Sequence, residues 1–113
     1  MKQSSLFNHL EFNESNPVIT VLLETSFTKE IRIAMHAGTH MKQHKTSFPI
    51  VVELVEGTLD FGVNDTAYQL QKGDLIALDA SVPHDLKAKT NSIVRLTLTK
   101  NDLTERVEKV IEK

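Results

Sequence analysis

The sequence contains no cysteine. This absence excludes disulfide bonds, thiolate nucleophiles and the zinc or iron–sulfur sites that depend on cysteine. Basic residues form no long run but are scattered among acidic ones, with a formal net charge of −2, so the chain lacks the usual electrostatic footprint of nucleic-acid binding. No segment is apolar for long enough to span a membrane, and residues 1–16 show no signal-peptide pattern. We therefore expect a cytoplasmic protein without nucleic-acid or membrane partners.

Short strand-like runs separated by turns make up most of the chain. The 113 residues have the length of a single domain. Runs of apolar and β-branched residues, many alternating with polar ones, are typical of strands. They span residues 18–23, 31–35, 49–55, 59–63, 68–70, 75–78, 84–88 and 93–98. With no helical period between them, these runs predict an all-β antiparallel sandwich or barrel over about residues 17–99, and closing the sheet would hide its edges.

The period of the apolar residues changes near the C-terminus. Asp102 and Glu105 have the spacing of a capping box, which predicts a helix over about residues 102–113. Helical spacing continues through Leu103, Val107, Val110 and Ile111. This apolar stripe requires a partner surface, either the outer face of the barrel or a second subunit.

Alternation along the strands also predicts which residues form the core. The expected core residues are Val52, Leu54, Phe61, Leu70, Leu75, Ala77, Leu86, Val94, Leu96 and Leu98. Glu53 and Arg95 alternate with these residues, so both are expected to face outward, where Arg95 can pair with an acidic side chain.

Two segments resemble the two motifs of the cupin family. The first begins at Gly38, places His44 six residues later and closes at Gly57. The second begins at Gly73 and ends in Pro83-His84. The resemblance covers roughly residues 31–99 and implies an antiparallel double-stranded jelly-roll barrel of the RmlC-like type, commonly a homodimer. The family's second histidine and its glutamate fall at Thr46 and Ile50, so His44 and His84 are what remains of its four usual metal ligands.

The residues themselves indicate how a metal site could form. His44 and His84 lie on different predicted strands, and inward side chains from distant strands can meet inside a barrel. His40 precedes His44 by four residues, so strict alternation places both on one face. The predicted site is His40, His44 and His84, with a divalent transition metal (Zn, Ni, Fe or Mn) as the candidate cofactor. The alternative is that these histidines are ordinary polar residues without a metal.

Three functions remain open from the sequence, and two of them use the barrel interior. The preferred one is a cupin that binds a small molecule, whose identity the sequence does not reveal. The alternative is a metal-dependent enzyme, which the resemblance implies would be of isomerase or dioxygenase type, using His44 and His84. The third is an interaction role, in which the chain forms a homodimer. No Ser-His-Asp arrangement, phosphate loop or pair of catalytic carboxylates indicates another reaction class.

Overall fold

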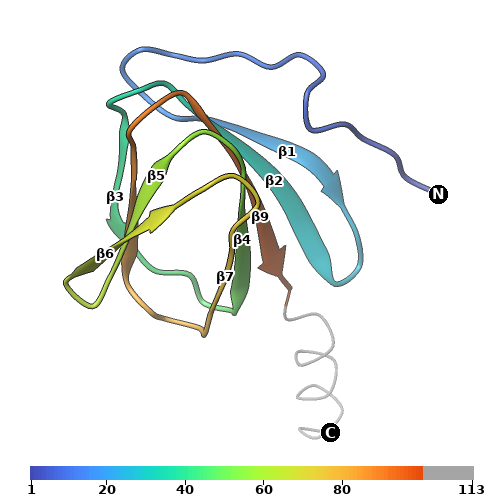
Figure 1. Ribbon diagram of the computed structural model, residues 1–113. Helices are drawn as coiled ribbons and strands as arrows, with labels where there is room; N and C mark the ends of the chain where they lie inside the picture. Colours follow the sequence, from blue (N-terminus) through green and yellow to red (C-terminus); the bar gives the residue numbers. More distant parts are fainter. Residues whose placement is uncertain (101–113) are drawn as a thin grey trace, which may run out of the picture.

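The structure is a computed structural model that describes residues 1–100, and it consists of two antiparallel sheets that face each other (Figure 1). One sheet has the strand order β1-β2-β9-β4-β7, and the other has the order β3-β8-β5-β6. The strands are β1 (Val18–Glu24), β2 (Thr28–Met35), β3 (His40–His44), β4 (Ile50–Glu56), β5 (Leu59–Val63), β6 (Thr66–Leu70), β7 (Leu75–Leu78), β8 (His84–Ala88) and β9 (Ser92–Thr99). The all-β prediction is confirmed, whereas the expected helix over 102–113 lies outside the described residues.

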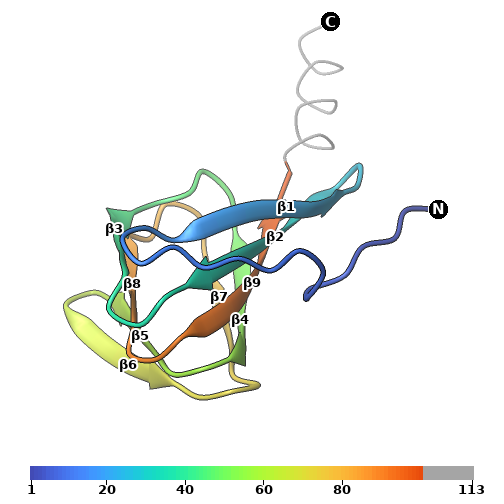
Figure 2. The ribbon, with the colours of Figure 1, turned by 90° about the horizontal axis from the view of Figure 1, so that it is seen from above.

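The two sheets do not close into one continuous barrel. Within residues 1–100 every ladder joins strands of the same sheet, so β1 and β7 are the edges of one sheet and β3 and β6 the edges of the other. The β1–β2 hairpin projects to one side of the facing sheets (Figures 1 and 2). The expectation of a closed sheet was therefore wrong, because the core is enclosed by packing two sheets face to face. Across residues 1–100 there is also no helix that could traverse a bilayer.

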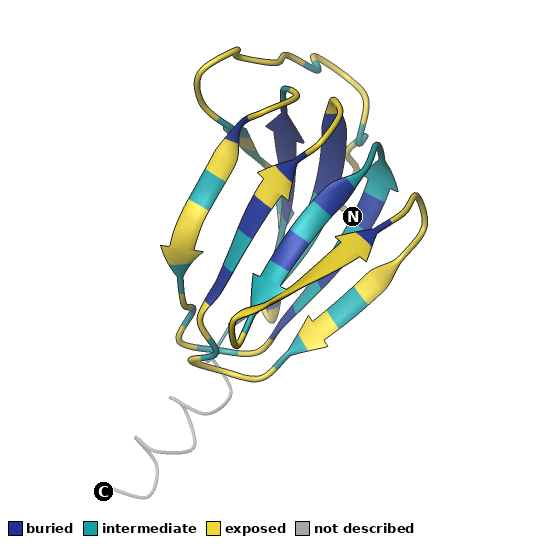
Figure 3. Cartoon of the chain, turned by 60° about the vertical axis from the view of Figure 1, so that its left-hand side comes forward, coloured by how far each residue is buried: buried dark blue, intermediate teal, exposed yellow. Residues whose placement is uncertain are grey.

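The core lies between the two sheets and largely follows the predicted alternation. Four of the predicted core residues are at most 2% exposed: Val52, Leu54, Phe61 and Val94. Burial alternates with exposure along several strands, as the colouring in Figure 3 shows. Each such side chain contributes roughly 1.5–3 kcal/mol when it is removed from water.

The sequence predicted the wrong buried face for β7. Leu75 and Ala77 are exposed, whereas Ile76 and Leu78 pack against the core. The register explains this, because Ile76 pairs with the buried Val52 and cross-strand partners share a face. A shift of one residue in phase exchanges the two faces of a strand.

The outer face of the five-stranded sheet is polar and partly covered by the N-terminal segment. Arg95 forms ion pairs with Glu53 at 3.1 Å and with Glu30 at 3.0 Å, which confirms its predicted outward position. Arg32 is only 2% exposed. Its guanidinium donates hydrogen bonds to the backbone carbonyls of Leu6, Asn8 and His9. Arg32 therefore fastens the N-terminal segment, which runs past β1 and β2 in Figure 2.

Candidate functional site

A pair of imidazoles forms the centre of the candidate site. His44 ends β3 and His84 begins β8, and the two residues are direct partners in the antiparallel ladder. Their ring centroids lie 4.3 Å apart with an interplanar angle of 62°. His84 is only 3% exposed, whereas His44 is half-buried. The ladder therefore brings together two side chains that are 40 positions apart in the sequence.

These two rings face a small cavity between the sheets. The cavity has a volume of about 20 Å³. Its lining consists of Ile33, Met41, His44, Val52, His84, Leu86, Val94 and Leu96. A space of this size accommodates about one water molecule, whereas pockets for organic ligands typically measure about 300–1,000 Å³. The interior therefore matches a single ion or water in size, and an organic guest would enter only if side chains moved.

Backbone carbonyls determine which ring nitrogens are free. Nδ1 of His84 lies 2.9 Å from the carbonyl oxygen of Val82, and Nδ1 of His44 lies 2.7 Å from that of Lys42. A carbonyl oxygen only accepts hydrogen bonds, so each Nδ1 is inferred to be the protonated nitrogen. Each neutral ring then keeps a lone pair on Nε2. Metal-binding histidines have this arrangement, in which the second nitrogen donates to a carbonyl or carboxylate.

Burial keeps His84 in its neutral form. The pKa of His84 lies below its ordinary value near 6.5, chiefly because burial disfavours the charged ring. The Val82 carbonyl opposes this effect, the neighbouring His44 adds to it and Asp85 opposes it. His84 also stacks on the buried Phe61, with centroids 5.6 Å apart. At neutral pH His84 therefore offers a nitrogen lone pair rather than a positive charge.

His40 does not join this pair. Its Nε2 lies 2.8 Å from Oδ2 of Asp85, and its side chain is 44% exposed, on the outer face of the four-stranded sheet. An irregularity in β3 explains the difference: Met41 pairs with Leu86 and His44 with His84, so β3 advances three residues while β8 advances two. The extra residue of this bulge places Met41, rather than His40, on the face of His44. The prediction that His40 and His44 share a face was therefore wrong.

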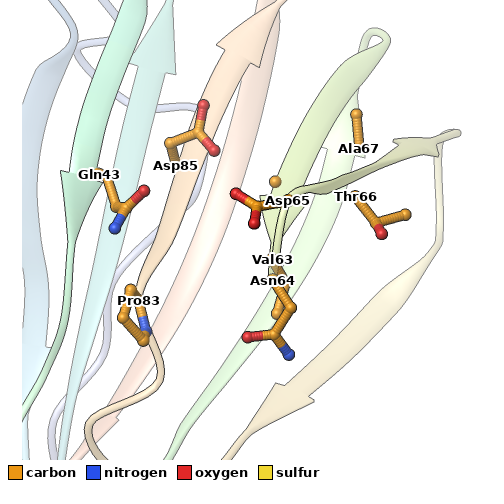
Figure 4. A pocket seen from close by; sticks show the side chains of 9 residues that line it. Gln43, Val63, Asn64, Asp65, Thr66, Ala67, Pro83 and Asp85 are labelled. Carbon is orange, nitrogen blue, oxygen red and sulfur yellow. The ribbon is translucent and has the colours of Figure 1, made fainter.

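Sequence reasoning missed a second hollow on the outer face of the four-stranded sheet. It measures about 380 Å³ and is polar, with Asp65 and Asp85 facing it from two sides (Figure 4). Gly62 makes room for the Asp85 carboxylate, because a Cβ at Gly62 would lie 2.0 Å from Oδ1 of Asp85. The available signal was the glycine inside a strand, which often marks a close approach of another group.

The family comparison agrees with the two-sheet, all-β architecture. The family described as "Cupin domain" matches residues 31–100. The chain belongs to the cupin family. A match of this extent confirms the family resemblance inferred from the two motifs. Among curated proteins, none matches this chain.

Solved structures show the same fold at low sequence identity. An RmlC-like cupin from Desulfovibrio desulfuricans superposes with a TM-score of 0.80 and 22% identity, over 88% of this chain and 96% of that one. An RmlC-like cupin from Shewanella frigidimarina gives 0.67 and 21%, over 72% and 73% of the two chains. KdgF from Halomonas sp. gives 0.65 and 13%, over 75% and 82%. At these identities the similarity establishes the fold alone.

Cupins often bind a metal, and the side chains of this cupin fit a reduced version of such a centre. Thr46 donates its hydroxyl to the carbonyl of Phe48 at 3.0 Å and does not line the cavity of His44 and His84. Ile50 is a buried aliphatic residue. Within residues 1–100, no three His, Cys, Asp or Glu side chains are arranged to hold a metal ion. The residues therefore fit a site with two imidazole ligands, not the four-ligand centre.

Proposed function

We propose that this cupin binds a single metal ion between His44 and His84. The observation that carries the proposal is that both rings line one small cavity with their Nδ1 atoms already bonded to carbonyls. A bound metal lies about 2.0–2.1 Å from each histidine nitrogen, so two nitrogens that share an ion lie no more than about 4.2 Å apart. The ring centroids lie 4.3 Å apart, so the two imidazoles are close enough for both to approach one ion.

The size of the cavity favours an ion over the organic ligand that the sequence analysis preferred. About 20 Å³ is too little for an organic molecule, and most of the remaining lining is aliphatic. Because two protein ligands replace the usual three or four, we expect weaker binding than in a complete site.

Titration of protein purified without a histidine tag tests this proposal. After removal of metal with a chelator, the protein is titrated with Zn²⁺ by calorimetry. His44→Gln and His84→Gln should each weaken binding at least tenfold, because each removes a ligand. The matched control is His40→Gln, which removes an outward imidazole and should leave the affinity unchanged. Wild-type affinity in His84→Gln, or loss of binding in His40→Gln alone, would contradict the proposed site.

A metal-dependent enzyme is the second candidate. An ion held by two protein ligands keeps coordination positions open, and open positions are what metal catalysis requires of a site. The cavity beside the two imidazoles has no space for an organic substrate, so the binding function is the better supported of the two. Turnover that requires both metal and His84, in a screen of isomerase and dioxygenase substrates, would reverse this preference.

We also propose that two copies associate through β1. This strand is a sheet edge, and its Ile19 and Val21 are 58% and 52% exposed. An exposed edge with aliphatic side chains is a favourable surface for pairing with another chain. Light scattering should give the mass of a dimer, and Val21→Lys should shift it toward the monomer. A monomeric mass for the wild type at high micromolar concentration would refute the association.

A further inference from the structure

We infer that the site is built for copper in its monovalent state, with Met41 as a third ligand beside His44 and His84. This inference rests on the proposed metal-binding function and specifies which metal the cavity selects. It also accounts for Met41, a residue that the histidine pattern alone leaves without a role.

The bulge in β3 places Met41 at the site. Met41 is half-buried on β3 and lines the same cavity as the two histidines. Its ladder partner is Leu86, which is 3% exposed and lines that cavity as well. Met41 and His44 are three residues apart and would lie on opposite faces of a regular strand. The irregular register gives them a common face, so the cavity has two imidazoles and one thioether.

The donor atoms favour a soft metal. Thioether sulfur binds Cu(I) in preference to hard divalent ions, and imidazole nitrogen is also a good copper ligand. Among residues 1–100, no carboxylate belongs to the cavity lining. Asp85 follows His84 in the sequence but contacts His40 on the outer face of the sheet. The carboxylates that hard divalent ions usually receive from proteins are therefore missing from this lining.

The free-energy cost of burying charge also favours a monovalent ion over a divalent one. All three donors are neutral, and the other lining residues are aliphatic. The free energy required to move an ion into an apolar medium rises with the square of its charge, so a divalent ion costs about four times as much as a monovalent ion of equal size. Without an anionic ligand to offset that cost, the cavity favours the monovalent ion.

The competing interpretation is that Met41 only fills space, as methionine often does in irregular cores. Substitution by leucine separates the two interpretations, because leucine has a similar volume but no sulfur. Met35 provides the matched control. It lies on β2, is completely buried and does not belong to the lining of this cavity. Met35→Leu therefore reproduces the change in the core without touching the proposed ligand.

The experiment compares two metals in four proteins, under anaerobic and reducing conditions. Wild type, Met41→Leu, Met35→Leu and His84→Gln are stripped of metal, and their Cu(I) affinities are measured by competition with the chromophoric chelator bicinchoninate. Zn²⁺ affinities come from competition with a zinc dye. Met41→Leu should lower Cu(I) affinity at least tenfold and leave Zn²⁺ affinity within about twofold, while Met35→Leu changes neither. His84→Gln should weaken the binding of both metals.

The outcomes distinguish the inference from the function on which it rests. If Zn²⁺ binds through His84 but Cu(I) affinity is the same in Met41→Leu and wild type, the role of Met41 is refuted and the histidine site survives. If neither metal binds, or His84→Gln binds both as well as wild type, the site itself is refuted. Circular dichroism of each variant confirms that the fold is retained. X-ray absorption of the copper-loaded protein should show a sulfur neighbour that Met41→Leu lacks.

Discussion

Gly57, the last glycine of the first cupin motif, should tolerate no side chain. It follows β4 with a φ of +97°, which lies in the left-handed region that favours glycine. A Cβ at this position would lie 2.4 Å from the carbonyl oxygen of Asn91 and 2.8 Å from Cα of Ser92. These are backbone atoms, so they cannot rotate out of the way. Gly57→Ala would therefore displace the start of β9.

Two effects combine in the expected loss of stability. The left-handed conformation costs an alanine about 1–2 kcal/mol, and overpacking typically adds about 1–3 kcal/mol. The free energy of unfolding should therefore fall by about 2–5 kcal/mol. A natural domain has a total stability of about 5–15 kcal/mol, so this loss would be a large fraction of it.

Gly73→Ala is the matched control. Gly73 has a similar φ of +91°, but within the described residues 1–100 no heavy atom beyond its two chain neighbours lies within 4 Å of the position that a Cβ would take. The free energy of unfolding of Gly73→Ala should fall only by the cost of the left-handed conformation, about 1–2 kcal/mol. Urea unfolding followed by far-ultraviolet circular dichroism suits this tryptophan-free chain, and the denaturant slopes should agree. Equal losses in Gly57→Ala and Gly73→Ala would show that the close approach to β9 is not what requires a glycine.

Two further predictions concern the buried His84 and Arg32. The pKa of His84 is lowered in the folded state, so below about pH 6.5 the unfolded chain binds more protons than the folded chain. Metal-free protein should therefore keep the full contribution of His84 to its stability above that pH. It should lose this stability as the pH falls toward the folded-state pKa. Urea titrations at about pH 7.5 and 5.5 test this, and an equally large loss in His84→Gln would exclude His84 as the cause. Arg32→Gln should release the N-terminal segment, because it removes the guanidinium that binds three backbone carbonyls. Limited proteolysis should cleave that segment at least tenfold faster than in the surface control Lys87→Gln, and equal rates would contradict the fastening role.

Alternation along the sequence correctly predicted the buried face of strands that contain both apolar and polar residues. In β4 and β9, Glu53 and Arg95 each stand between apolar neighbours, so one polar side chain sets the phase of the strand, and both faces were predicted correctly. In β7 all four residues are apolar. No polar residue sets the phase there, and the pairing with β4 decided that Leu75 faces outward.

The candidate site shows the same division. The two cupin motifs identified His44 and His84, because the motif spacing is a property of the chain. The sequence of β3 has a single apolar residue, Met41, so no local pattern revealed its bulge. The bulge depends on pairing with β8, and because of it Met41 lines the cavity where regular alternation would have placed His40.

By itself, the sequence determined the strands, most of the core and the cupin motifs, because these follow from residue order and a period of two. Only the tertiary structure decided that two open sheets enclose the core, that the N-terminal segment covers Arg32 and that the cavity holds little more than one water. Each of these features depends on how distant segments pack against one another. Register and packing are set by the whole chain at once, so neither can be read from any single segment.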